Sequence, residues 1–211
     1  MDPKISAIKS WLSSRSINIF GIQFAGKDSV GTPLAQELDG EFISSGDIVR
    51  AAAKNSTDQA IKKAAKITES GVLAPTEEFR RLIVPYLTDP KLAGKPLVLG
   101  SVGRWIGEED IVMHALHASG HDLAAVIVLN ISLSEVWRRW DNVRATRNGG
   151  RADDLTRERV ERRLSEYQTK TLPVIAKYRQ LGLTIDIDAT GPVDETIAIV
   201  NDALFDYARS H

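Results

Sequence analysis

The chain has 211 residues, of which 43% are hydrophobic and 26% are charged, and its net charge is -1. This composition is enough for one globular core, and the near-zero charge argues against nucleic acid or another polyanion as the partner. Cysteine is absent, which excludes a disulfide framework and a thiolate metal site. Since we find neither a signal peptide nor an apolar run of membrane-spanning length, we expect a soluble cytoplasmic protein.

Strands and helices are expected to alternate from the N-terminus onward. Apolar positions at helical spacing predict an amphipathic helix over 4–14. Residues 17–21 (INIFG) are a short apolar run typical of a buried strand, and a loop leads from it to a helix predicted over 30–40, closed by Gly40. A second strand is predicted over 41–46, followed by helices over 45–55, 56–71 and 76–89, the last with Thr76 as its N-cap.

The second half of the chain repeats this alternation. Near-continuous apolar runs over 96–100 and 123–131 predict buried strands, and alternation over 183–189 predicts a last strand. Helices are predicted over 104–120, 132–146, 154–182 and 193–210, with Pro173 kinking or breaking the third of them. Strands that alternate with helices predict a parallel sheet covered by helices on both faces.

One loop carries the first chemical signal. The segment 21–29 (GIQFAGKDS) lies between a predicted strand and a predicted helix, and it fits the phosphate-loop pattern G-x-x-x-x-G-K-[ST] at Gly21, Gly26 and Lys27. Backbone N–H groups and the positive end of a helix dipole meet in such a loop, so phosphate should bind there. Asp28 departs from the pattern, which requires Ser or Thr. The alternative interpretation is a glycine turn with a surface lysine.

Five segments, in order, make the chain resemble an adenylate kinase of the nucleoside monophosphate kinase family, with a short lid. They are the phosphate loop, ISSGDIVRAA (43–52), ESGVLAPTE (69–77), SVGRWIGEE (101–109), and the group RRWDNVR (138–144), RADD (151–154) and ERRLSEY (161–167). Each segment alone is a weak match, but five in order with fitting gaps are strong. The resemblance runs from about Ile17 to the C-terminus.

The resemblance implies a P-loop nucleoside-triphosphate-hydrolase-like fold, in which a five-stranded parallel sheet lies between two layers of helices. It divides the chain into a core domain (1–44, 78–143 and 155–211), a monophosphate-binding lobe (45–77) and a short lid (144–154). It also implies transfer of the γ-phosphate of ATP to a nucleoside monophosphate, by default AMP, with Mg²⁺ as cofactor. We expect a monomer that binds neither nucleic acid nor membrane.

The matched motifs supply the expected site residues. Arginine suits a phosphate site because its planar fork binds phosphate oxygens bidentately and stays charged. The expected catalytic residues are Lys27, Arg104, Arg144, Arg151 and Arg163. The expected ATP-binding residues are Gly21, Phe24, Ala25, Gly26, Lys27, Asp28, Ser29, Trp140 and Arg144. The expected monophosphate-binding residues are Ser45, Gly46, Arg50, Leu73, Ala74, Arg104, Glu108, Arg151 and Arg163. Asp28 and Ser29 are the expected Mg²⁺ contacts, directly or through water. For Arg163 the alternative is an ion pair on an exposed helix face.

Two departures from the family pattern concern the metal. Asp28 stands where the family has a small residue, and Gly100 stands where the family usually has an aspartate near Mg²⁺. A carboxylate beside polyphosphate is repulsive unless a cation lies between them. We therefore expect Asp28 to supply the carboxylate that Gly100 cannot. The alternative is that both changes mark lost catalysis with nucleotide binding retained.

Two further positions have two interpretations each. Glu108 stands where the family usually has a Gln that contacts the acceptor adenine, and an ionised Glu only accepts hydrogen bonds. It therefore allows a different acceptor base, or it is a surface acid in the run GEED. Trp140 lies near the position of an arginine over the donor base, so it either stacks on that base or packs in the core.

The sequence is compatible with three functions. The phosphotransferase leads, because binding alone does not need arginines that converge from both sides of a cleft. A catalytically weak nucleotide-binding module is the second. A nucleic-acid binder that uses the basic stretch 138–151 is the third, and the near-zero net charge argues against it.

Overall fold

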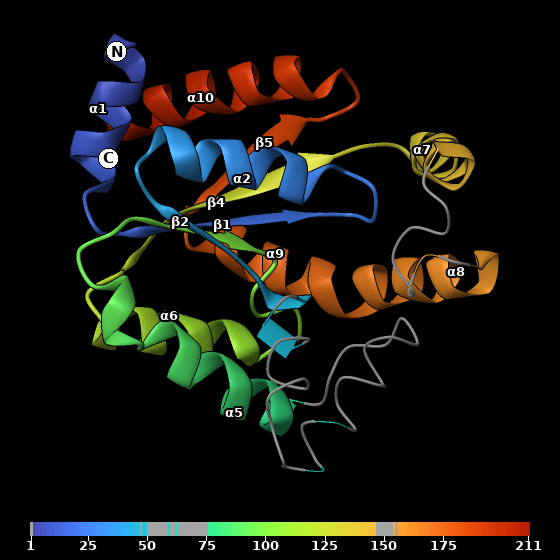
Figure 1. The fold of residues 1–211 in the computed structure, drawn as a ribbon, viewed down its shortest axis with the longest axis horizontal. Helices are drawn as coiled ribbons and strands as arrows, with labels where there is room; N and C mark the ends of the chain where they lie inside the picture. The colour runs from blue at the N-terminus through green and yellow to red at the C-terminus, as the bar shows by residue number, and fades with distance from the viewer. Residues whose placement is uncertain are drawn as a thin grey trace.

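The structure is a computed structural model, and it describes residues 2–46, 48, 49, 59, 62, 76–146, 154 and 156–211. Its strands are β1 (Ser16–Gly21), β2 (Glu41–Ser44), β3 (Leu97–Gly100), β4 (Leu123–Asn130) and β5 (Thr184–Asp188). They form one parallel sheet in the order β2-β3-β1-β4-β5. The predicted parallel α/β fold is confirmed, with all five strands close to where the sequence patterns place them (Figure 1).

Helices cover both faces of this sheet (Figure 1). On one face lie α1 (Pro3–Leu12), α2 (Lys27–Glu37) and α10 (Val193–Ser210), which share one buried apolar cluster with the sheet. On the other face lie α5 (Thr76–Leu87), α6 (Glu108–Ala118) and α9 (Leu172–Gln180), which bury two further clusters. All six residues of β1 are buried because both of its faces are covered, as its largely apolar sequence predicts.

Two helices extend beyond the edge of the sheet at which β1 and β4 end (Figure 1). They are α7 (Leu133–Thr146) and α8 (Arg157–Glu166), and they pack on each other through a small buried cluster that includes Val136, Trp140 and Val160. Ile22 and Phe24 of the loop after β1 pack against the same cluster. The apolar side chains of the loop therefore tie these outer helices to the sheet.

The interruption expected at Pro173 takes the form of a π-helix. This short segment, η3 (Tyr167–Thr171), joins α8 to α9, and the Leu172 N–H bonds to the Tyr167 carbonyl. Proline at the start of α9 has no N–H to donate, so the regular ladder cannot pass through it. The helical path continues across Pro173 with one wider turn.

Two of the helix ends that differ from the sequence prediction are explained by a left-handed residue beside them. The helix α2 ends at Glu37, and Asp39 takes the left-handed conformation (φ 55°), while the Gly40 N–H bonds back to the Ala35 carbonyl at 2.8 Å. The prediction that Gly40 closes the helix was therefore one residue late. The helix α6 starts at Glu108 and not at 104, because Gly107 (φ 92°) turns the chain just before it.

Candidate active site

The candidate site lies at one edge of the sheet, where the parallel strands all end. The phosphate loop follows β1, Ser45 and Gly46 follow β2, Arg104 lies in the loop after β3, α7 follows β4, and residues 189–193 follow β5. Open parallel sheets bind ligands at this edge, near the strand where the order of connection reverses. Segments that are far apart in the sequence therefore converge on one region.

The loop after β1 has the backbone of an anion-binding turn. Phe24 and Gly26 both have positive φ (63° and 90°), and α2 begins directly afterwards at Lys27. Gly21 is required by a close approach, since a Cβ there would lie 2.9 Å from the Leu129 carbonyl oxygen. The Lys27 Nζ donates to the carbonyls of Gly21 (2.8 Å) and Ile22 (3.0 Å). The Lys27 side chain therefore folds back over the loop, and its ammonium group lies against the backbone at the start of the loop.

The space beside Gly100 is filled by an aromatic ring. A Cβ at Gly100 would lie 3.0 Å from Cζ of Phe42, and one at Gly31 of α2 would lie 2.3 Å from Cε2 of the same ring. Phe42 of β2 thus rests against two glycines, one on each neighbouring element. An aspartate at position 100 would require this ring to shift. Packing against Phe42 therefore explains a glycine at position 100, independently of the expected exchange of carboxylates with Asp28.

Glu108 lies at the first position of α6 and is only 2% exposed. Its Oε2 accepts the backbone N–H groups of Arg104 (2.8 Å) and Trp105 (3.0 Å). Burial raises the pKa of Glu108 above its ordinary value, and the two N–H donors act against that rise. The interpretation of Glu108 as a surface acid was therefore wrong. Its contact with an acceptor base stays a prediction.

Arg163 contacts Asp154 directly, and Arg144 is linked to the same residue through Trp140. The Arg144 guanidinium lies 4.6 Å from the centre of the Trp140 ring, the Trp140 Nε1–H donates to the Asp154 carbonyl at 2.9 Å, and Arg163 forms an ion pair with the Asp154 carboxylate. Trp140 is 5% exposed and belongs to the cluster between α7 and α8. The Trp140 ring therefore packs in the core, and this burial argues against its stacking on a nucleotide base.

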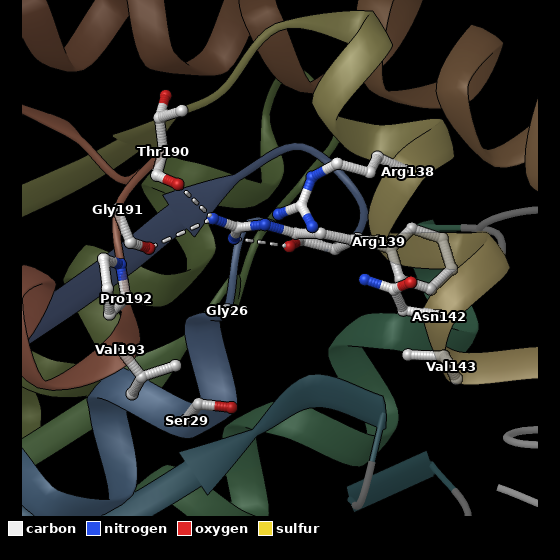
Figure 2. A pocket seen from close by; sticks show the side chains of 11 residues that line it. Gly26, Ser29, Arg138, Arg139, Asn142, Val143, Thr190, Gly191, Pro192 and Val193 are labelled. Carbon is white, nitrogen blue, oxygen red and sulfur yellow. Dashed lines mark hydrogen bonds between the residues drawn. The ribbon is translucent and has the colours of Figure 1, made fainter. Parts of the chain in front are cut away.

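A pocket of about 530 Å³ opens between α7, the phosphate loop and the loop after β5 (Figure 2). Its lining residues are Phe24, Gly26, Ser29, Arg138, Arg139, Asn142, Val143, Thr190, Gly191, Pro192 and Val193. Three of these, Phe24, Gly26 and Ser29, were expected ATP-binding residues. The contributions from α7 and from 190–193 were missed. A search of the residues directly after each predicted strand could have found the second group, because 190–193 follow β5.

Arg139 joins the walls of this pocket (Figure 2). Its guanidinium donates to the Phe24 carbonyl (3.1 Å) and to the carbonyls of Ala189 (2.6 Å), Thr190 (3.0 Å) and Gly191 (3.3 Å). The Glu135 carboxylate accepts from Arg139 and also from Arg138. The hydrogen bonds from these two arginines lower the pKa of Glu135 to about 2. An ionised, nearly buried carboxylate thus holds both arginines on the pocket.

The remaining expected contacts divide by position. Ser45 is buried directly after β2, and Ala25 is buried in the phosphate loop. Arg50, Leu73, Ala74 and Arg151 lie outside the described residues, so their roles stay predictions. Within the described part of the chain, no group of three or more His, Asp or Glu side chains could hold a metal ion by itself. Over the same residues, no helix is long and apolar enough to cross a membrane.

The chain is similar to curated adenylate kinases over most of its length. It is 31% identical to the adenylate kinase of Leifsonia xyli subsp. xyli over 188 residues, which cover 88% of this chain and 91% of the relative. It is 30% identical to that of Streptomyces coelicolor (89% and 97% covered) and 28% identical to that of Thermus thermophilus (90% and 97% covered). No protein-family model matches the chain.

Proposed function

The chain belongs to the adenylate kinase family, and we propose that it transfers the γ-phosphate of ATP to AMP, giving two molecules of ADP. The observation that carries this proposal is the convergence at one sheet edge of a phosphate loop with Lys27 and of arginine-bearing loops and helices. Phosphoryl transfer between two nucleotides gathers many negative charges in one cleft, so the task of the protein is to position and neutralise them. No observation on the described residues favours an inactive nucleotide-binding module.

The residues divide between donor and acceptor. The phosphate loop and Lys27 would hold the donor phosphates, and the pocket lined by Arg138 and Arg139 would take the donor nucleoside. Arg104 and Arg50 would bind the acceptor phosphate. Arg144, Arg151 and Arg163 would surround the phosphoryl group during transfer, with closure of the lid (144–154) excluding water.

The residues near the start of α2 suit a magnesium ion. Mg²⁺ is usually bound through one or two protein oxygens together with substrate phosphates and water, so it needs no protein cage. Asp28 and Ser29 place a carboxylate and a hydroxyl in the first turn of α2, directly after the phosphate loop. When bound there, Mg²⁺ would offset the charge of the polyphosphate. Asp28 would thereby lose the repulsion that it otherwise exerts on ATP.

The test is detection of ADP formation by a coupled assay, using ATP with AMP, GMP, CMP and UMP in turn, with and without Mg²⁺. We expect turnover that needs Mg²⁺ and prefers AMP. A preference for another monophosphate would correct the acceptor, and binding of ATP without turnover of any monophosphate would contradict the proposal. We also propose that the chain works as a cytoplasmic monomer, which sedimentation at working concentration would check for the oligomeric state.

A further inference from the structure

The loop of residues 101–107, which carries Arg104, is held by hydrogen bonds along most of its backbone. From the sheet side, the Ser101 N–H donates to the Ile19 carbonyl at 2.9 Å. The Asn18 side chain pairs with both backbone groups of Val102, donating to its carbonyl at 2.7 Å and accepting its N–H at 3.2 Å. Asn18 is itself fully buried in β1. The start of the loop is thus fixed to the strand beside the phosphate loop.

From the helix side, two consecutive carboxylates accept three further N–H groups of the loop. Glu108 accepts those of Arg104 and Trp105, and Oε2 of Glu109 accepts that of Gly107 at 2.8 Å. Glu109 is fully buried, and its Oε1 bonds to Nζ of Lys177 in α9 at 2.7 Å. Burying two acidic side chains side by side is costly unless each is well bonded. Here Oε2 of Glu108 and both oxygens of Glu109 accept from backbone N–H groups of this loop and from one lysine.

A third contact holds the side chain next to Arg104. The ammonium of Lys170, in the π-helix η3, lies 3.9 Å from the centre of the Trp105 ring and pairs with the Glu166 carboxylate at 2.8 Å. A cation over an indole face is attracted by the ring electrons. The helix that continues from α8 therefore touches the loop directly beside the arginine expected to bind the acceptor.

We propose that Glu108, Glu109 and Lys170 are positioning residues that keep the 101–107 loop in one conformation, so that Arg104 is ordered before the acceptor phosphate binds. Because the loop is already ordered, none of the binding free energy is lost in ordering it. Binding of the acceptor phosphate, which every monophosphate carries, is therefore stronger. The inference rests on the proposed function only in the identity of the ligand of Arg104. In this role Glu108 acts on the phosphate end of the acceptor and leaves the choice of base to other residues.

The first experiment does not depend on activity. Amide hydrogen exchange of residues 101–107 is followed by NMR in the wild type, Glu108→Leu, Glu108→Gln and the control Glu37→Gln, which removes an exposed carboxylate at the far end of α2. We expect the Arg104 and Trp105 amides to exchange about tenfold faster or more in Glu108→Leu, because their acceptor is lost. Glu108→Gln keeps an acceptor oxygen, so its exchange rates should lie between those of the wild type and Glu108→Leu. Glu37→Gln should exchange at the wild-type rates. Unchanged exchange in Glu108→Leu would overturn the proposal.

The second experiment measures KM for ATP and for each monophosphate. Glu108→Leu should raise the KM of every monophosphate by a common factor of about ten or more and leave the KM of ATP within about twofold. Lys170→Met, which tests the same loop if Glu108→Leu fails to fold, should raise acceptor KM about two- to fivefold. If the increase in KM differed strongly between monophosphates, Glu108 would be contacting the base, and the proposal would be overturned. Absence of turnover in the wild type would contradict the proposed function. The hydrogen-exchange result would still show whether Glu108 orders the 101–107 loop.

Discussion

At the scale of single residues, Asp28 is the position at which the chain departs most from a standard phosphate loop. It lies in the first turn of α2, where the helix dipole favours an anion but bound polyphosphate would repel one. These opposed effects are reconciled if a cation lies between the two anions. The contribution of Asp28 to turnover should therefore depend on the concentration of Mg²⁺.

We predict that Asp28→Gly lowers turnover by about tenfold or more at a fixed, moderate Mg²⁺ concentration, since one charge-assisted contact typically contributes ~1.5–3 kcal/mol. Measuring kcat as a function of Mg²⁺ concentration would check this, with Asp206→Asn on the exposed face of α10 as the control. Unchanged or improved activity in Asp28→Gly would rule out the exchange of carboxylates between positions 28 and 100.

Arg139 is a single side chain whose contacts span three segments of the donor pocket. Its hydrogen bonds to Phe24, Ala189 and Thr190 link α7 to the phosphate loop and to the loop after β5. We predict that Arg139→Met raises KM for ATP about tenfold and changes KM for AMP less than twofold, because only the donor pocket loses a wall. Steady-state kinetics with each substrate varied would test this, with Arg179→Met as a matched control from an exposed ion pair. An equal rise in both KM values would contradict it.

At the scale of elements, the first turn of α7 is stabilised by the carboxylate of Glu135 between two arginines. The pKa of Glu135 is about 2, against an ordinary 4.5, so the folded state holds this proton more weakly than the unfolded state. The stabilisation is therefore complete above about pH 4.5 and is lost as the pH falls toward 2. Stability would increase as the pH falls only if folding raised the pKa of Glu135.

We predict that the unfolding free energy of Glu135→Gln falls less steeply than that of the wild type as the pH is lowered from about 4.5 to 2. Urea unfolding measured at half-unit pH steps would show the difference. Glu37→Gln, which removes an exposed carboxylate, should keep the wild-type slope. Parallel curves for the wild type and Glu135→Gln would mean that the ion pairs of Glu135 do not stabilise the fold.

At the scale of the whole molecule, the N-terminal helix lies at the end of the sheet opposite the site (Figure 1). The helix α1 packs on α10 at the end of the molecule opposite α7 and α8, and Ile8 and Leu12 are fully buried in the cluster beneath it (Figure 1). The adenylate kinase resemblance begins only after it, at about Ile17. Its contribution should therefore be to stability and not to the chemistry.

We predict that Leu12→Ala destabilises the protein by about 2–5 kcal/mol while leaving both KM values unchanged at temperatures where it is folded. Thermal unfolding and kinetics on the same sample would test this together. The exposed neighbour Ser13 offers a control, since Ser13→Gly suits its positive φ of 52° and removes no buried group. A change in KM for either nucleotide in Leu12→Ala would show that α1 is coupled to the site.

The sequence was sufficient for the fold because apolar runs and turn residues are local signals. It predicted all five strands, the phosphate loop and the break at Pro173. It could not predict the role of Glu108, because that depends on which buried N–H groups lie within reach of a carboxylate. It also missed Arg139, whose partners at 189–191 lie about fifty positions away and meet it only through the parallel order of β4 and β5.

The ring of Phe42 couples three positions sterically, namely 31, 42 and 100. It occupies the place where a side chain at 31 would begin and lies close to the place where one at 100 would begin, so a larger residue at either position requires the ring to move. A designer who wishes to restore an acid at the end of β3 must shrink residue 42 first, because the reverse order passes through an overpacked intermediate. The side chain at position 42 therefore sets how much room is left for an acid at the end of β3.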